Sequence, residues 1–233
     1  MKMGPQAYLA ELIGTFALVF FGTVSITVFV AILGLSSPAG SVIAIALTFG
    51  IILMSMVYVL GPLSGCHVNP AVTITAVALR KMAVDDGVLY IVAQVVGAVL
   101  AVGAHAVILP EAGAMTEFGA TLPGVPIGRS DMVALVVELI ITFFLMLSIY
   151  AVAYTDKVPN GISGLLIGMT LVGLTIVAWP LTGASTNPAR SIGPAIWSGA
   201  YQSLWVYIVG PIVGALLAGF AYQYLLTPRK RKR

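Results

Sequence analysis

Two copies of the tripeptide Asn-Pro-Ala could gather polar groups at one point of a chain that is otherwise strongly apolar. Asn is a preferred N-cap and Pro is favoured at the first helical position, so each copy predicts a loop that turns into a helix. The start of a helix presents unpaired N–H groups and the positive end of the helix dipole. We therefore expect one shared site that favours neutral polar molecules and repels cations. The six residues are Asn69, Pro70, Ala71, Asn187, Pro188 and Ala189.

The other reactive side chains do not indicate catalysis. The sequence contains no nucleophile beside a base, no carboxylate pair at catalytic spacing and no glycine-rich phosphate loop, so we expect neither an enzyme nor a cofactor. Cys66 is the single cysteine, which rules out an internal disulfide and a cysteine-based metal cluster. The two histidines, His67 and His105, have no neighbours at metal-ligand spacing, so no metal is expected.

The composition places the chain in a lipid bilayer. Of its 233 residues, 60% are hydrophobic and only 8% are charged, and the mean hydropathy is +1.07. A soluble domain carries about 25% charged residues, so these are too few to cover a soluble surface. The net charge of +3 comes from the tail 229–233, which beside apolar spans indicates topology rather than nucleic-acid binding. We expect a membrane protein that binds no nucleic acid and retains its first helix.

Six stretches are long enough to cross a hydrocarbon core, which needs about 20 residues. They cover 6–33, 41–60, 87–109, 131–154, 161–179 and 203–226. Two shorter apolar inserts, 64–80 and 184–198, carry the Asn-Pro-Ala copies and predict re-entrant segments. Irregular backbone at membrane depth is tolerated only inside protein or beside a water-filled cavity. The predicted fold is an all-α integral membrane protein with six transmembrane helices and two re-entrant half-helices.

The chain divides into two similar halves. Residues 11–16 (Glu-Leu-Ile-Gly-Thr-Phe) parallel residues 138–143 (Glu-Leu-Ile-Ile-Thr-Phe), and the Tyr-Ile-Val at 90–92 returns at 207–209. Each half has three spans, so the second half must enter the membrane from the opposite face, as in an inverted repeat. We expect one membrane domain, with halves of about 1–109 and 131–233 joined by an extracellular loop at 110–130.

This topology brings the two half-helices together. Each would be about 15 Å long at 1.5 Å per residue, so two that enter from opposite faces meet at the midplane. Asn69 would then face Asn187, and both helix dipoles would point their positive ends at one spot. A proton or cation there would meet an electrostatic barrier, whereas a neutral polar molecule would meet oriented donors.

Basic residues predict the orientation. If the chain crosses the membrane six times, most of the basic residues fall on one face of the membrane, and only Arg129 and Arg190 fall on the other. The residues on the first face are Lys2, Arg80, Lys81, Lys157 and the tail 229–233. The positive-inside rule then places both termini in the cytoplasm, and we expect a multi-pass protein of the cell membrane.

At these residues the chain resembles the aquaporins of the major intrinsic protein family, over essentially its whole length. The resemblance rests on the two Asn-Pro-Ala copies, on Ala-Glu-Leu-Ile-Gly-Thr-Phe at 10–16 and on Arg190 after the second copy. Residues 210–215 and 222–224 are most similar to the archaeal branch. The resemblance implies a passive channel, a homotetramer and one pore in each subunit.

The resemblance also implies roles for individual residues. Asn69 and Asn187 would donate amide hydrogens to a passing molecule. One wall of the pore would be lined by backbone carbonyls of Gly65, Cys66, His67, Val68, Gly183, Ala184, Ser185 and Thr186. The selectivity filter would consist of Phe49, Thr175, Ala184 and Arg190. Arg190 fits independently, because a fixed cation near the outer mouth offers five donors and repels cations.

The filter positions leave the permeant solute open. Water-only members usually place a His where this chain has Thr175, and glycerol facilitators usually have two aromatic residues and an Asp after the Arg. Here Phe49 is the one aromatic residue, and Ser191 follows Arg190. We expect water as the main substrate, with passage of small neutral solutes such as glycerol or dissolved gases. The alternatives are a glycerol facilitator with water secondary, an ion-coupled transporter and a structural membrane protein that does not conduct.

Glu11 and Glu138 are ionisable residues inside predicted spans, at equivalent positions of the two halves. An intramembrane carboxylate predicts a function, which here is either a proton relay or an acceptor that braces the amides of an irregular loop. We favour the brace. His67 either faces the pore or braces its loop, and His105 is expected to be a satisfied residue at the membrane interface. Cys66 is either buried packing or a mercury-sensitive group beside the pore.

Overall fold

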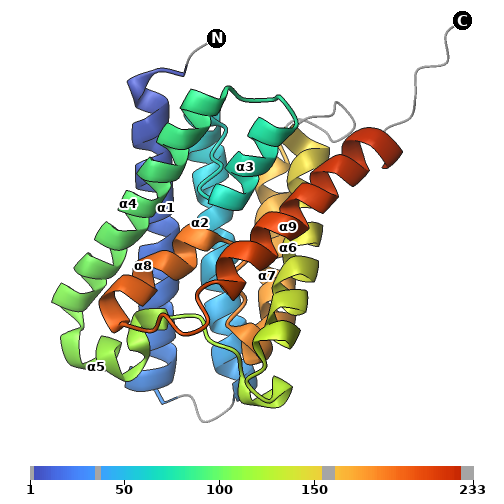
Figure 1. Ribbon diagram of the computed structural model, residues 1–233. Coiled ribbons are helices and arrows are strands. Elements are labelled where there is room, and N and C mark those ends of the chain that lie inside the picture. The colour runs from blue at the N-terminus through green and yellow to red at the C-terminus, as the bar shows by residue number, and fades with distance from the viewer. Residues whose placement is uncertain (1–2, 35–37, 154–160, 227–233) are drawn as a thin grey trace, which may run out of the picture.

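The computed structural model describes residues 3–34, 38–153 and 161–226, and these form a helical bundle (Figure 1). Within them, six helices are long and apolar enough to cross a membrane. Their bounds are Pro5–Ile32, Ala39–Ser64, Val84–Ile108, Asp131–Ala153, Ser163–Thr182 and Val206–Leu226. The six predicted spans are confirmed. Lys2, Lys157 and the basic tail 229–233, on which the predicted orientation partly rests, lie outside the described residues.

Within the described residues, eight α-helices and two π-helical segments form the bundle and its two inserts. One further α-helix and two 3₁₀ turns lie in the connecting loop. The spans are α1 (Pro5–Ile26) with the π-helix η1 (Thr27–Ile32), α2 (Pro38–Ser64), α4 (Val84–Ile108), α6 (Asp131–Ala153), α7 (Ser163–Thr182) and α9 (Val206–Ala221) with the π-helix η4 (Tyr222–Leu226). The half-helices are α3 (Pro70–Ala78) and α8 (Pro188–Ser198). The connecting loop holds α5 (Pro110–Met115) and the 3₁₀ turns η2 (Glu117–Gly119) and η3 (Val125–Ile127).

The two half-helices start inside the bundle and run toward opposite ends. In Figure 1, α3 runs toward the end where α1 begins, and α8 runs toward the end where α5 lies. Pro70 and Pro188 occupy the first helical positions, as expected. With 9 and 11 residues, neither helix is long enough to cross a membrane.

Two spanning helices extend further than the sequence predicts. α2 continues through Pro62 to Ser64, and α7 continues through Pro180 to Thr182, whereas we expected loops from about 61 and 179 onward. A proline inside a helix loses one backbone hydrogen bond, which favours termination. Here a buried carboxylate stabilises each last turn. Ser64 Oγ donates to Glu11 and Thr182 Oγ1 donates to Glu138, each at 2.7 Å. These are tertiary contacts, and residue propensity contains no information about them.

Small residues let equivalent helix pairs pack backbone against backbone in the two halves. A Cβ atom added to Gly97 on α4 would lie 2.4 Å from the carbonyl oxygen of Leu12 on α1. One added to Gly214 on α9 would lie 2.2 Å from the carbonyl oxygen of Leu139 on α6. Distances below 3.0 Å are sterically forbidden, so both positions require glycine for this packing.

The connecting loop at 110–130 is ordered and packs onto the second Asn-Pro-Ala segment. Thr121 Oγ1 donates to Ser191 Oγ at 2.8 Å, and Gly124 N donates to the carbonyl of Leu181 at 2.7 Å. His105 lies beneath this loop with both ring nitrogens within hydrogen-bond distance of threonine hydroxyls, 3.1 Å from Thr23 and 3.0 Å from Thr27. His105 is therefore satisfied, and its side chain is fully buried near the end of α4.

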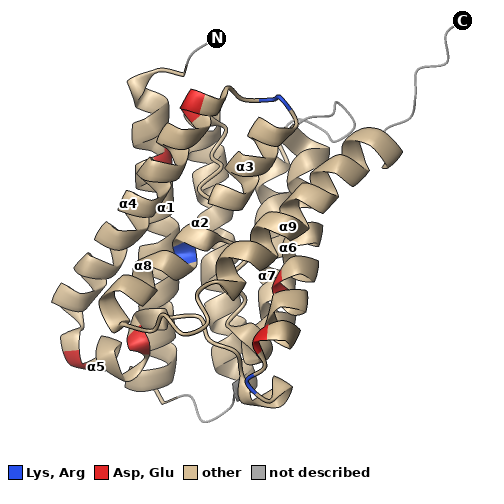
Figure 2. Ribbon diagram, in the orientation of Figure 1, with Lys and Arg blue, Asp and Glu red and all other residues tan. Residues whose placement is uncertain are grey.

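Charged residues lie mainly near the two ends of the bundle (Figure 2). Among the residues that the structure describes, Glu11 on α1, Glu138 on α6 and Arg190 at the start of α8 are charged and at most 1% exposed. Because a charge inside a membrane is costly, such residues are expected to be paired or functional. All three lie around the two Asn-Pro-Ala segments.

Candidate functional site

Asn69 and Asn187 cap the two half-helices. Oδ1 of Asn69 accepts a hydrogen bond from Ala71 N at 2.9 Å, and Oδ1 of Asn187 accepts one from Ala189 N at 3.0 Å. Both asparagines have the extended backbone that is typical of an N-cap. The two N-caps predicted from the sequence are confirmed.

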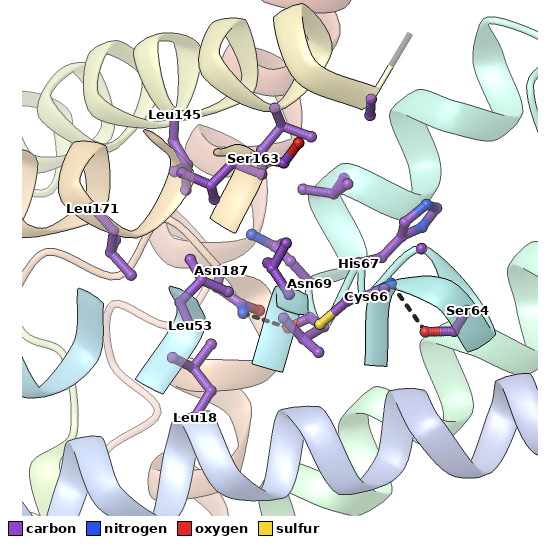
Figure 3. Close-up of a pocket in the computed structure, with 18 of the residues that line it drawn as sticks. Leu18, Leu53, Ser64, Cys66, His67, Asn69, Leu145, Ser163, Leu171 and Asn187 are labelled. Atoms are coloured by element: carbon purple, nitrogen blue, oxygen red, sulfur yellow. Dashed lines mark hydrogen bonds between the residues drawn. The ribbon is translucent and has the colours of Figure 1, made fainter. Parts of the chain in front are cut away.

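The amide nitrogens of these side chains tie the two loops together. Nδ2 of Asn69 donates to the carbonyl of Thr186, and Nδ2 of Asn187 donates to the carbonyl of Val68, both at 2.8 Å. Figure 3 shows Asn69 and Asn187 close together at the wall of a cavity. An amide nitrogen carries two hydrogens, so each asparagine keeps one that this cross-pairing does not use. The carbonyls of Val68 and Thr186, which we expected to face a pore, each accept one cross-loop hydrogen bond.

The loops before the two half-helices have a strained backbone. Cys66, Val68, Ala184 and Thr186 have φ values of 49°, 43°, 48° and 54°. This left-handed region costs an L-residue roughly 1–2 kcal/mol, and it is a genuine outlier for β-branched Val68 and Thr186. Such strain persists only where surrounding contacts hold the backbone in place.

Glu11 provides those contacts for the first loop. Oε1 accepts hydrogen bonds from His67 N at 2.9 Å and from Ser64 Oγ at 2.7 Å, and Oε2 accepts one from Val68 N at 2.7 Å. The carboxylate is fully buried. Its described partners are donors, which is the arrangement that stabilises a fixed buried carboxylate.

Glu138 repeats this arrangement in the second loop. Oε1 accepts from Ser185 N at 2.9 Å and from Thr182 Oγ1 at 2.7 Å, and Oε2 accepts from Thr186 N at 2.8 Å. Both glutamates thus bind two successive backbone amides and the last hydroxyl of the preceding helix. This geometry favours the bracing role over a proton relay.

The bracing determines where the loop carbonyls point. In a planar trans peptide, the C=O points away from the N–H of the same unit, and the described residues contain no cis peptide. Since the amides of His67 and Val68 point at Glu11, the carbonyls of Cys66 and His67 point away from it. In the same way, the amides of Ser185 and Thr186 point at Glu138, so the carbonyls of Ala184 and Ser185 point away from it. Gly65 and Gly183, which precede these residues, also have positive φ values of 81° and 74°.

Gln94 on α4 is part of this site, although it was not among the residues predicted from the sequence. Its Nε2 donates to Glu11 Oε2 at 2.7 Å and lies 3.0 Å from Thr73 Oγ1, and the side chain is fully buried. A polar residue in the middle of an apolar span is itself a signal that could have found it. By the register of the Tyr-Ile-Val repeat, the second half carries Pro211 at this position. The two halves therefore brace their loops differently.

His67 both contacts its own loop region and faces the cavity, which are the two roles that the sequence left open. Its Nδ1 lies 3.1 Å from Thr73 Oγ1, and its ring packs edge-on against Tyr90. The same side chain lines the cavity and is half-buried (Figure 3). The ring is therefore held by α3 and α4 while one side remains open to the cavity.

A cavity of about 540 Å³ leads to the two asparagines. It begins among residues such as Lys81 and Gly161 and extends to Phe49 and Arg190. One wall consists of the two loops with their polar backbone, and the other wall is apolar (Figure 3). The apolar wall includes Leu18, Leu53, Val57, Leu145, Ile149 and Leu171.

Arg190 lies at the inner end of this cavity and keeps unused donors. Its Nη1 donates to the carbonyl of Gly119 in the connecting loop at 2.7 Å, and its Cζ lies 5.1 Å from the ring centroid of Phe49. The side chain is 1% exposed, yet Nε and Nη2 have no hydrogen-bond partner within the described chain. A buried guanidinium with free N–H groups is positioned to bind an acceptor oxygen.

The structure brings three of the four expected filter residues to the cavity. Phe49, Ala184 and Arg190 line it. Thr175, on α7, is 2% exposed and does not line it. Gly119, whose carbonyl accepts a hydrogen bond from Arg190, is a site residue that the sequence does not predict, because nothing in a loop sequence indicates that contact.

Six membrane-spanning helices around a cavity that two opposed polar loops enter define a membrane channel. Comparison with known proteins agrees, because the chain matches the family described as Major intrinsic protein over residues 2–222. The chain belongs to this family, whose members are passive channels and not enzymes. The resemblance to aquaporins drawn from the sequence is confirmed.

Similar proteins span several branches of the family. A probable aquaporin of NIP type from Nicotiana alata is 40% identical, covering 98% of this chain and 80% of the relative. Aquaporin AqpM from Methanothermobacter thermautotrophicus is 38% identical (93% and 96% covered), and the glycerol uptake facilitator protein-like 6 from Lactiplantibacillus plantarum is 42% identical (92% and 95% covered). The X-ray structure of the aquaglyceroporin from Plasmodium falciparum has the same fold, with a TM-score of 0.83, 23% identity and coverage of 95% and 96%.

Proposed function

We propose that this protein is a water channel that also passes small neutral solutes and excludes protons and ions. It would act as a homotetramer in the cell membrane, with both termini in the cytoplasm and one pore in each subunit. Its two halves form an inverted repeat joined by an extracellular loop at 110–130. Glycerol and dissolved gases are the secondary solutes that this pore would admit.

The observation that carries the proposal is the set of unused donors along one cavity. Asn69 and Asn187 each keep one amide hydrogen, and Arg190 keeps the hydrogens on Nε and Nη2. A water molecule that enters a narrow passage loses hydrogen bonds to other water molecules and needs replacement partners. These donors bind its oxygen. The carbonyls that point away from Glu11 and Glu138 would accept its hydrogens.

The same groups oppose the passage of cations. The half-helices α3 and α8 direct their N-termini at the two asparagines, so both dipoles present positive ends there. Arg190 adds a full positive charge at the end of the cavity. The asparagines are neutral, and a proton-coupled carrier would need a titratable group in their place.

A glycerol facilitator is the second candidate. The continuous apolar wall beside a polar wall suits the carbon chain and hydroxyl groups of a polyol. One of the similar proteins is a glycerol uptake facilitator-like protein. Small residues at Thr175 and Ala184 would also leave the filter wider than a strict water filter.

Water and glycerol permeability should be measured in the same proteoliposomes by osmotic light scattering. Water permeability well above that of empty vesicles, and above that of glycerol, supports the proposal. Faster glycerol entry than water flow would favour the facilitator, and shrinkage equal to that of empty vesicles would indicate a protein that does not conduct. Transport that saturates or stops on addition of an uncoupler would indicate a carrier.

Thr175→His should narrow the filter and reduce glycerol permeability relative to water by roughly tenfold, the effect of a barrier of about 1.4 kcal/mol. The imidazole adds bulk and a donor at a position where Thr175 is buried on α7. Thr175→Val, which keeps the size, is the matched control and should leave the ratio near that of the wild type. An unchanged ratio in Thr175→His would remove Thr175 from the filter.

Mercuric ion should block water flow by binding to the thiol of Cys66. This side chain lines the cavity, is 6% exposed and belongs to the single cysteine of the chain. We expect mercury to remove most of the water permeability of the wild type and little of that of Cys66→Ser. Equal inhibition of both proteins would mean that mercury acts elsewhere.

A further inference from the structure

Gly22 on α1 lies directly behind the aromatic ring of Phe49. A Cβ atom added to Gly22 would lie 2.2 Å from Cε1, 2.3 Å from Cζ and 2.8 Å from Cδ1 of that ring. Atoms in ordinary contact are 3.4–4 Å apart, so the ring occupies the space that a side chain at position 22 would need. We infer that Gly22 is a specificity-determining position, which sets the width of the constriction through Phe49.

The ring of Phe49 lies between α1 and the guanidinium of Arg190. Its centroid is 5.1 Å from Cζ of Arg190, and the side chain lines the cavity. Phe49 also belongs to a buried cluster with Leu18, Ile26 and Ile45, which restricts sideways movement of the ring. A ring displaced from α1 therefore moves toward the cavity and Arg190.

α1 is not free to withdraw instead. It also packs closely against α4, where the added Cβ at Gly97 would lie 2.4 Å from the carbonyl oxygen of Leu12. The connecting loop also packs on α1, since an added Cβ at Gly119 would lie 3.1 Å from Cβ of Thr23. With α1 held by two neighbours, the ring of Phe49 is the part that yields.

The expected displacement is large for a pore of this kind. Alanine at position 22 would require the ring to move from 2.2 Å to at least 3.4 Å from the new methyl group. This shift is close to the radius of a water molecule, about 1.4 Å. Gly22 thus keeps the constriction open at one of its sides, although it contacts no solute itself. This inference rests on the proposed function, in that Phe49 and Arg190 form the narrow part of the pore.

Gly22→Ala tests the inference. We expect glycerol permeability to fall by roughly tenfold, the effect of a barrier of about 1.4 kcal/mol, and water permeability to fall less. Phe49→Leu in the same chain removes the ring, so Gly22→Ala/Phe49→Leu should recover the permeabilities of Phe49→Leu alone. Gly173→Ala on α7 is the matched control, because a Cβ atom there meets nothing within 4 Å.

Thermal unfolding of the four variants in detergent separates a failed inference from a failed function. Gly22→Ala should unfold at a lower temperature than the wild type, and adding Phe49→Leu should restore most of that loss. If Phe49→Leu restores the unfolding temperature in detergent but the protein conducts no water in vesicles, the contact between Gly22 and Phe49 is supported and the proposed function is overturned. Wild-type permeability and stability in Gly22→Ala, or a loss that Phe49→Leu does not restore, would overturn the inference about Gly22.

Discussion

Arg190→Ala is expected to raise proton and cation leak through the protein by roughly 100-fold. A cation about 5 Å from the guanidinium is repelled by roughly 3 kcal/mol at an effective dielectric constant of about 20, and each 1.36 kcal/mol corresponds to a factor of ten. Arg190 is 1% exposed at the end of the cavity, so solvent screens its charge weakly. The measurement is proton flux into vesicles that contain a pH-sensitive dye, with water flow recorded in parallel.

The matched variants separate the charge from the shape of the side chain. Arg190→Lys keeps the charge but loses the forked donors, so it should keep leak low while altering the water-to-glycerol ratio. Arg129→Gln removes an exposed arginine from the connecting loop and should change neither quantity. If proton flux in Arg190→Ala stays at the wild-type level, the dipoles of α3 and α8 alone repel cations and Arg190 has no part in charge exclusion.

Glu138→Gln is expected to lower the free energy of unfolding by about 3 kcal/mol or more and to abolish most water permeability. The carboxylate accepts three hydrogen bonds, two of them from the amides of Ser185 and Thr186. A hydrogen bond to a charged group contributes about 1.5–3 kcal/mol, and an amide –NH₂ would oppose one of these donors with another donor. Without the carboxylate, the positive φ of Ala184 and Thr186 is no longer held.

This substitution also distinguishes the brace from a proton relay. A relay predicts a stable Glu138→Gln protein with normal water flow and altered proton flux, whereas a brace predicts lost stability and lost water flow. Glu111→Gln on α5 changes an exposed carboxylate and is the matched control. Thermal unfolding in detergent and osmotic light scattering of the same preparations provide the two measurements.

The sequence alone determined the six spans, the two half-helices and their caps. These features are local, because the length of an apolar run decides whether it spans a membrane and an Asn-Pro pair specifies a helix start where it stands. The equivalence of Glu11 and Glu138 also followed from the sequence, since their surrounding residues repeat. The family resemblance added the filter positions, three of which line the cavity.

Only the tertiary structure decided how the two loops are joined. The cross-pairing of Asn69 with Thr186, the support of Glu11 by Gln94 and the contact of Gly119 with Arg190 connect residues 70 or more positions apart. The extra turn to Ser64, against the preference of Pro62, has the same origin. Which distant segments meet, and at what distance, depends on the packing of whole helices. The two asparagines therefore mark the site in the sequence, but the opposite loop determines which of their hydrogens remain for a solute.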